Sequence, residues 1–221
     1  MLPIILKLRL ATMAMAGLTA AGSPVPMPPQ VMMAVLAGNA AQPIEVSFYD
    51  ENDHQAGTVA IWRDGATDDD TAAQIKHLFR CRTTHREKMI AQQTLAMIAD
   101  VSEHYPGKAI EYISALRVGR DEGPNSPHRD GRAIDFRIRG IQLREIRDYL
   151  WTHYNDVGVG WYPSEQFVHI DTRPGLHDTS WTFLHGENHY HPFWAALARD
   201  PDLQARIAAW QAKHQQPHAG S

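Results

Sequence analysis

The sequence predicts an α+β protein in which a small antiparallel sheet packs with helices. Segments with the two-residue period of strands are mixed with segments of helical period, without the strict alternation of βαβ units, and this mixture is typical of the α+β class. The 221 residues are 43% hydrophobic and 21% charged, which is the composition of a globular protein with a sizeable core.

The first expected elements are a hairpin and a capped helix. Residues 44–49 and 58–62 have the pattern of strands and flank the polar turn 50–57, which is a hairpin signal. The segment Thr-Asp-Asp-Asp at 67–70 then supplies capping groups for a helix whose apolar residues include Ile75.

A longer helix and a strand follow. Residues 87–104 carry apolar side chains mostly at helical spacing, and Pro106-Gly107 ends this pattern. A strand is expected at 109–116. It leads into a loop at 119–127 that is rich in glycine, proline and asparagine.

The second half of the expected domain completes the sheet. Residues 132–138 predict a strand, and 143–154 an amphipathic helix. Two further strands are expected at 158–162 and 166–171, joined by Pro163-Ser164.

The amino-terminal residues 1–41 are interpreted as a signal peptide or export leader. Lys7 and Arg9 precede a short apolar segment that ends in small residues, and two cleavage regions fit the pattern. The proline-rich segment 23–29 interrupts this part, whereas a membrane span needs about 20 continuous apolar residues. An uncleaved anchor or a wrongly assigned start codon is the alternative interpretation.

Charge and cysteine content exclude several kinds of site. The net charge of −4 gives no electrostatic footprint for nucleic acid. Cys81 is the single cysteine, so neither an intramolecular disulfide nor a cysteine zinc site can form, and we interpret it as a small semi-buried thiol.

Three side chains form a candidate metal site. Apolar residues alternate with Asp135 in one predicted strand and with His169 and Asp171 in another, so these polar side chains lie on the face opposite the core. His128 belongs to the loop just before the strand that holds Asp135. Two imidazoles and one carboxylate suit tetrahedral Zn²⁺ with a fourth position for water, which is the pattern of a catalytic site. One Zn²⁺ per chain is therefore expected.

An ordered set of motifs extends this interpretation. The segments are Ile113-Ser-Ala-Leu-Arg117, Ser126-x-His128, Asp135, Val159-Gly-Trp-Tyr-Pro163, Phe167-Val-His-Ile-Asp-Thr172 and Ser180-Trp181. Together they resemble the murein endopeptidase K type of zinc peptidase, which is grouped with D-alanyl-D-alanine peptidases, lysostaphin-type enzymes and hedgehog signalling domains. The resemblance covers about residues 44 to 181. It implies a hedgehog/D-Ala-D-Ala peptidase-like fold with the zinc site on one face of the sheet.

The resemblance also implies roles for single residues. His128, Asp135 and His169 would be the zinc ligands. Arg117 stands where related enzymes keep an arginine that binds the substrate or its developing oxyanion, and an ordinary ion pair is the alternative for it. Ser126 is expected to support the turn and to help bind the substrate, and a nucleophilic role is not needed beside zinc-bound hydroxide.

The general base is the point at which this sequence departs from its relatives. Gln166 occupies the place of a glutamate, and Phe167 that of a histidine, and neither can take a proton. Glu165 would have to be brought to the site by a local bulge. Asp171 could act as the base or as the partner that orients an imidazole.

Two groups of residues near the motifs keep alternative interpretations. Trp161 and Tyr162 could line a substrate groove or belong to the core. His185, His189 and His191 could form a second metal site or reach the pocket as a base, or they could be part of a polar connector.

The sequence thus predicts an exported or periplasmic zinc metallopeptidase that hydrolyses peptide crosslinks or stem peptides of bacterial peptidoglycan. Residues 42–195 would be the peptidase domain, and 196–221 a closing helix and tail. Peptidoglycan peptides are the expected partners, with no nucleic acid and no stable membrane insertion after removal of the leader. A non-catalytic zinc module that binds cell wall or a protein is the alternative, because the usual base is missing.

Overall fold

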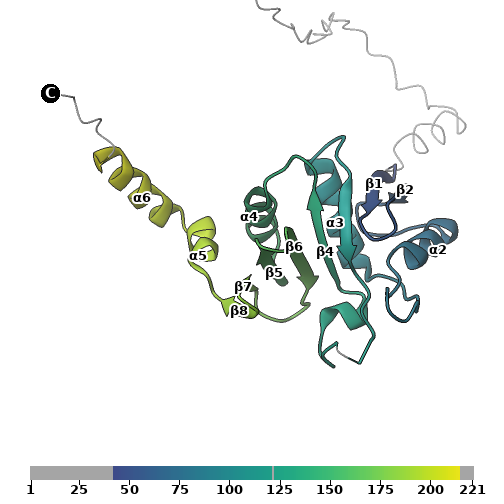
Figure 1. Ribbon diagram of the computed structural model, residues 1–221. Coiled ribbons are helices and arrows are strands. Elements are labelled where there is room, and N and C mark those ends of the chain that lie inside the picture. Colours follow the sequence, from purple (N-terminus) through teal and green to yellow (C-terminus); the bar gives the residue numbers. More distant parts are fainter. Residues whose placement is uncertain (1–41, 121, 215–221) are drawn as a thin grey trace, which may run out of the picture. The chain divides into compact units, whose positions relative to one another are not determined.

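The computed structural model describes residues 42–120 and 122–214. The leader expected at 1–41 therefore lies outside the described residues, as do positions 215–221 of the predicted tail. No helix in the described ranges is long and apolar enough to cross a membrane. The α+β prediction is confirmed, since helices and strands are mixed along the chain (Figure 1).

The strands form one sheet in the order β2-β1-β3-β4-β6-β5-β7-β8. They are β1 (Ile44–Asp50), β2 (Gln55–Ile61), β3 (Ile110–Ser114), β4 (Ala133–Ile138), β5 (Val157–Tyr162), β6 (Phe167–Thr172), β7 (Thr179–Leu184) and β8 (Glu187–Tyr190). Two neighbour pairs, β1 with β3 and β5 with β7, are parallel. The sheet is thus mixed, and it is larger than the small antiparallel sheet that was predicted. The prediction missed this because pairings between strands far apart in sequence leave no local signal.

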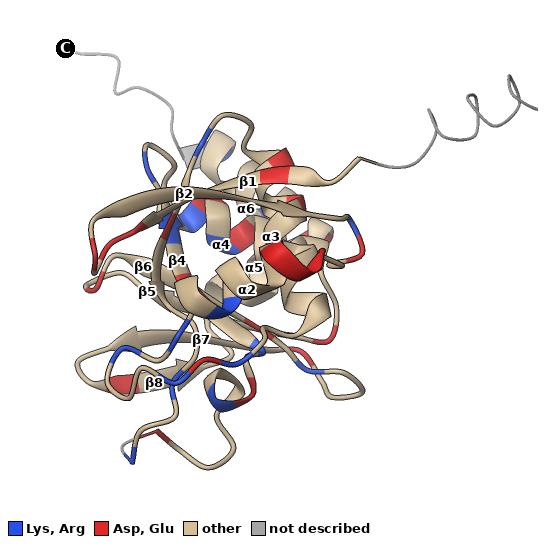
Figure 2. Cartoon of the chain, turned by 90° about the vertical axis from the view of Figure 1, so that its right-hand side faces the viewer, with Lys and Arg blue, Asp and Glu red and all other residues tan. Residues whose placement is uncertain are grey.

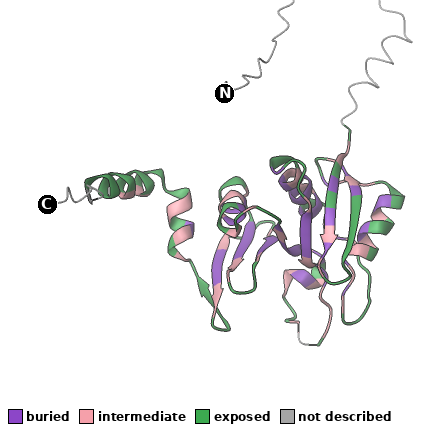
Figure 3. Cartoon of the chain, turned by 45° about the horizontal axis from the view of Figure 1, so that its top comes forward, coloured by how far each residue is buried: buried purple, intermediate pink, exposed green. Residues whose placement is uncertain are grey.

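The helices are α2 (Asp69–Leu78), α3 (Gln92–His104), α4 (Leu143–His153), α5 (Phe193–Arg199) and α6 (Pro201–His214), with the short 3₁₀ helix η1 (Pro127–Asp130). The apolar sides of α3 and α4 share one core with the inward residues of the central strands, such as Phe136 and Ile170. Figure 3 shows the buried residues concentrated on these strands. The polar residues that alternate with them lie on the other face of the sheet.

Helix boundaries follow local hydrogen bonds. Asp68 caps α2 as the sequence predicts, because its carboxylate accepts a hydrogen bond from Thr71 N at 2.7 Å. Helix α3 begins at Gln92 and not at 87. The reason is that Ala91 N donates to Gly131 O at 2.8 Å, which ties the preceding residues to a distant loop. Cys81 is 2% exposed and so is a fully buried thiol.

Helix α5 crosses the boundary expected between 195 and 196. The Trp151 indole on α4 donates to Ala195 O at 2.8 Å, and Arg199 donates to Trp151 O at 2.6 Å. These contacts attach α5 to α4 at positions 195 and 199.

Candidate metal centre

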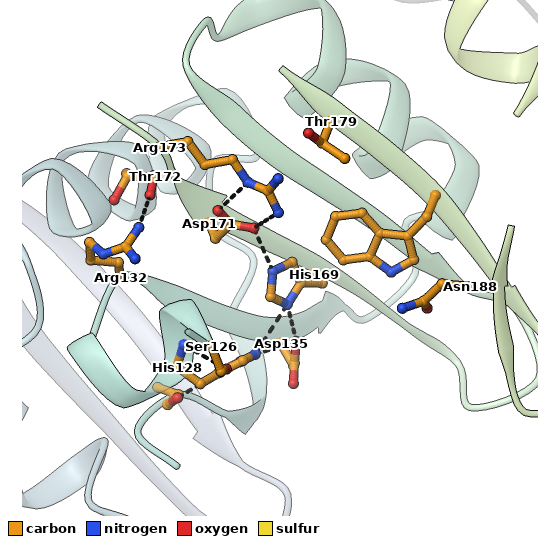
Figure 4. Close-up of polar contacts among 12 residues, drawn as sticks. Ser126, His128, Arg132, Asp135, His169, Asp171, Thr172, Arg173, Thr179 and Asn188 are labelled. Atoms are coloured by element: carbon orange, nitrogen blue, oxygen red, sulfur yellow. Dashed lines mark hydrogen bonds and ion pairs between the residues drawn. The ribbon is translucent and has the colours of Figure 1, made fainter. Parts of the chain in front are cut away.

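Three polar side chains from η1, β4 and β6 meet on the face of the sheet opposite the helical core (Figure 4). Asp135 lies directly opposite His169 in the register of β4 and β6. Oδ1 of Asp135 is 2.8 Å from Nδ1 of His169, which in turn is 3.1 Å from Nε2 of His128. The third side of this triangle, from His128 Nε2 to Asp135 Oδ1, is 3.4 Å.

This triangle has the dimensions and chemistry of a metal site. A tetrahedral ion with bonds of about 2.0–2.1 Å keeps its ligand atoms roughly 3.3 Å apart. The residues are 1%, 3% and 4% exposed for His128, Asp135 and His169, so an ion among them would be shielded from water on the protein side. Three protein donors leave one tetrahedral position for a water or substrate atom, as in catalytic sites. These three residues are also the group found among the described residues that could hold a metal ion.

Outer contacts fix which nitrogen each imidazole presents. Nδ1 of His128 is 2.6 Å from the carbonyl oxygen of Ala115, which can only accept, so Nδ1 carries the proton and Nε2 is free for a metal. Nε2 of His169 lies 3.0 Å from Oδ2 of Asp171 and so presents Nδ1. Arg173 holds Asp171 in a bidentate pair, with distances of 2.7 and 2.9 Å (Figure 4). Such outer partners are the usual companions of metal-ligating histidines.

Two glycines of β5 make room for this arrangement. Gly158 lies opposite Asp171, and Gly160 lies opposite His169. A Cβ atom on Gly158 would overlap the Asp171 carboxylate and the Arg173 guanidinium, and one on Gly160 would be 2.6 Å from the Trp181 ring. The Gly-x-Gly spacing therefore forms a recess on the ligand face while Val159 faces the core.

Replacing Gly158 with Ala should displace the Asp171–Arg173 pair. We expect the free energy of unfolding to fall by about 1–3 kcal/mol, as at other overpacked sites, and metal binding to become weaker. Gly57→Ala on β2 is the matched control, because nothing lies within 4 Å of a Cβ atom there. Thermal unfolding and metal content measure both effects. Equal stability and metal content in the two variants would contradict the steric argument.

The site is electrostatically prepared for a cation. Burial by itself raises the pKa of Asp135, but the imidazoles of His128 and His169 hold that pKa far below its usual range. Burial by itself lowers the pKa of His169, but hydrogen bonds with the carboxylates of Asp135 and Asp171 raise it to about 9. Two ionised carboxylates therefore flank His169, and the negative field that favours a proton there also favours a metal ion.

Arg117 lies beside the ligand carboxylate. Its Nη1 donates to Oδ2 of Asp135 at 2.9 Å, so that Oδ1 is left to face the two imidazoles. The side chain is 41% exposed and thus open to solvent. Ser126 caps η1, where its hydroxyl accepts from His128 N at 3.3 Å. The structure therefore places Ser126 in support of the turn that carries His128.

The two aromatic residues predicted for a groove lie on opposite faces. Tyr162 lies on the ligand face, stacked on Phe167 with ring centroids 4.3 Å apart, and its hydroxyl accepts from the Trp181 indole at 3.1 Å. Trp161 lies on the other face, where the Arg147 guanidinium of α4 packs 4.5 Å from its ring centroid. Only Tyr162 of this pair can therefore line a groove beside the candidate metal ligands.

The candidates for a general base are also placed. Gln166 adopts a positive φ of 61° in the turn between β5 and β6, and its amide donates to Pro163 O. Glu165 is exposed in the same turn, and the regular register of β6 from Phe167 onward contains no bulge that would bring it to His169. Asp171 is fully buried and faces the nitrogen of His169 that points away from the ligand triangle.

The histidine cluster near the end of the domain belongs to a hairpin. His185 and Gly186 both have positive φ and form the turn between β7 and β8. His189 lies opposite Thr182, whose hydroxyl accepts from the Trp194 indole of α5, so it faces away from the ligand side. No metal-ligand group within the described ranges includes His185, His189 or His191.

An α+β sheet that carries a buried His-Asp-His set, with donors suited to a tetrahedral metal ion, is the arrangement that the sequence resemblance implies for the D-alanyl-D-alanine peptidase-like class of metallopeptidases. Comparison with protein families agrees, because residues 38–177 match the model described as peptidoglycan L,D-endopeptidase MepK. The chain therefore belongs to the peptidoglycan L,D-endopeptidase MepK family.

Two curated relatives match a shorter segment. The probable peptidoglycan L,D-endopeptidase MepK of Haemophilus influenzae is 43% identical over 58 residues, which are 26% of this chain and 31% of that protein. The peptidoglycan L,D-endopeptidase MepK of Escherichia coli K12 is 41% identical over 71 residues, or 32% of this chain and 38% of that protein. The matched segment thus spans about a third of each relative. No solved structure shows a significant match to the chain.

Proposed function

We propose that this protein is an exported, zinc-dependent endopeptidase that hydrolyses peptide crosslinks of bacterial peptidoglycan. The observation that carries the proposal is the ligand triangle of His128, Asp135 and His169, which are all buried and whose imidazoles are oriented by outer contacts. The names of the relatives specify an L,D bond, and we propose a bond of that stereochemistry as the point of cleavage.

Zinc fits the donor set, since two imidazoles and a carboxylate suit its size and preferred tetrahedral geometry. When bound, zinc would acidify a water and polarise the carbonyl of the scissile bond. The protein's own contribution is positional. His128 and His169 are held in one tautomer each, and Asp135 is held by Arg117 so that a single oxygen faces the site.

Arg117 and Tyr162 are the residues we propose to contact the substrate. The Arg117 guanidinium uses Nη1 on Asp135 and has further N–H groups on its exposed side that can bind the carbonyl oxygen as negative charge develops. The hydroxyl of Tyr162 accepts from Trp181, and its own proton remains available to the substrate. Burial is the main cause that raises the pKa of Tyr162, so this hydroxyl stays protonated at neutral pH.

We propose a positioning role for Asp171. Both of its oxygens are engaged by His169 and Arg173, and it lies behind the imidazole as seen from the ligand triangle. A base must reach the attacking water within hydrogen-bond distance, directly or through one water. The contacts of Asp171 favour orientation of His169 over proton transfer. Glu165 remains the other candidate base named by the sequence.

Digestion of crosslinked muropeptides tests the proposal. We expect the zinc-loaded protein, lacking residues 1–41, to release uncrosslinked products that mass spectrometry identifies, and we expect a chelator to abolish and zinc to restore the activity. Zinc bound in stoichiometric amount without any product would instead support the non-catalytic binding module. Failure to bind zinc with all three ligands present would contradict both functions.

A further inference from the structure

The loop between Arg117 and His128 is closed at its base. Arg117 N donates to His128 O at 3.3 Å, so the residue proposed to bind the substrate and a metal ligand share a backbone hydrogen bond. Ten residues separate them, and all but residue 121 are described. Compact loops whose two ends meet in this way are often functional.

Glu122 of this loop faces Arg117. Oε2 of Glu122 lies 2.7 Å from Nε of Arg117, while Nη1 of the same guanidinium reaches Asp135. The Glu122 side chain is 15% exposed, against 41% for Arg117. The Arg117 guanidinium is thus paired with Glu122 through Nε and with Asp135 through Nη1, which leaves Nη2 for a further hydrogen bond.

The two carboxylates also solve an electrostatic problem. A divalent ion in the ligand triangle would repel the Arg117 guanidinium, and Asp135 would be shared between these two positive charges. Acidic and basic residues are interspersed in the view of Figure 2. The charge of Arg117 is therefore balanced by its own two partners, Glu122 and Asp135. Glu122 supplies the second negative charge that keeps Arg117 in place.

Arg129 fixes the loop that carries Glu122. It follows His128 directly in η1, and its guanidinium donates to three backbone carbonyls of the loop. Nη2 reaches Gly119 O and Glu122 O at 2.7 Å each, and Nε reaches Gly123 O at 3.1 Å and Glu122 O at 3.3 Å. The position of Glu122 is therefore tied to the same short helix that positions a metal ligand.

We infer that Glu122 and Arg129 are positioning residues that hold Arg117 in its substrate-binding orientation. The inference rests on the proposed function, because it takes a peptidoglycan peptide as the substrate that Arg117 binds. Arg129 holds the loop, the loop presents Glu122, and Glu122 with Asp135 directs the guanidinium toward the scissile carbonyl. Neither residue belongs to the ligand triangle.

The test compares Glu122→Gln and Arg129→Ala with the wild-type protein. We measure the affinity of metal-free protein for a crosslinked muropeptide by calorimetry, then zinc content, KM and kcat after zinc loading. Each variant should bind the peptide about tenfold more weakly, which is about 1.4 kcal/mol and the size expected for a partly buried ion pair that no longer orients Arg117. Zinc content should stay at the wild-type level. The double variant should lose no more than the stronger single one, because both residues act through one element.

Matched controls separate positioning from charge. Asp130→Asn removes an exposed carboxylate from the short helix η1, and Arg120→Ala removes an exposed arginine from the loop that carries Glu122. Neither change should alter the affinity for the muropeptide. Arg129→Lys keeps the charge but cannot reach three carbonyls, so it should behave like Arg129→Ala. The inference would be overturned if Glu122→Gln bound the peptide with wild-type affinity, or if Arg120→Ala lost as much affinity as Glu122→Gln. In either case, cleavage of the peptide by the wild-type protein would leave the proposed function intact. A wild-type protein that neither binds nor cuts the peptide would overturn both.

Discussion

Replacing His128 with Ala is expected to abolish metal binding and hydrolysis together. His128 is one of the three candidate ligands found among the described residues, and the Ala115 carbonyl orients its Nε2 toward the other two. Alanine has no donor atom that could replace this nitrogen. Loss of the metal removes several kcal/mol of transition-state stabilisation, and we expect the rate to fall roughly a thousandfold or more.

Thermal unfolding gives a readout of the same variant that does not depend on substrate. A metal present at about 100 times its dissociation constant stabilises a protein that binds it only when folded by about 2.7 kcal/mol. The wild-type melting temperature should therefore rise with zinc, and that of His128→Ala should not. His77→Ala is the control, since His77 is an exposed residue paired with Glu87 far from the ligand set in sequence and should keep the full zinc response. A zinc-dependent shift in His128→Ala would show that the metal lies elsewhere.

The strands that carry the ligands could be predicted because their signal is local. Apolar residues alternate with Asp135 in β4 and with His169 in β6, and one buried face fixes which side chains reach the other. The same two-residue period also places Arg173 on the face of His169 and Asp171, so the sequence pattern was sufficient to predict Arg173 as a neighbour of the site. Trp161 and Tyr162 are adjacent in one strand, so the period alone requires that they face opposite sides.

Other parts of the site depend on contacts that no local pattern records. Strand β8 reads Glu-Asn-His-Tyr and is exposed throughout, so nothing in its sequence distinguishes it from a polar connector. The parallel pairing of β5 with β7, which brings Trp181 beside Gly160, joins segments that are separated by all of β6. Glu122 stands in an irregular loop, where no period relates one residue to the next, and its role follows only from its distance to Arg117.

Asp171→Asn is expected to weaken metal binding by about 10- to 100-fold and to leave most of the activity once the site is saturated. The amide keeps the size of the carboxylate but loses the charge that stabilises the His169 N–H and the Arg173 guanidinium. His169 would then hold its ring less firmly and present Nδ1 less often. A defect of this kind is overcome by raising the zinc concentration.

A catalytic base would behave differently in the same experiment. If Asp171 transferred the proton, its amide variant would remain inactive however much zinc were bound, because an amide cannot take a proton. Activity is therefore measured across a zinc titration for Asp171→Asn and for Glu165→Gln, whose carboxylate lies in the exposed turn before β6. Recovery of Asp171→Asn at high zinc assigns it to orientation of His169. Persistent loss in Asp171→Asn with full zinc occupancy would make Asp171 the base and reverse the assignment proposed above. Persistent loss in Glu165→Gln alone would require the β5–β6 turn to move toward His169 when the substrate binds, since Glu165 lies in the exposed turn, four residues before His169 in the sequence.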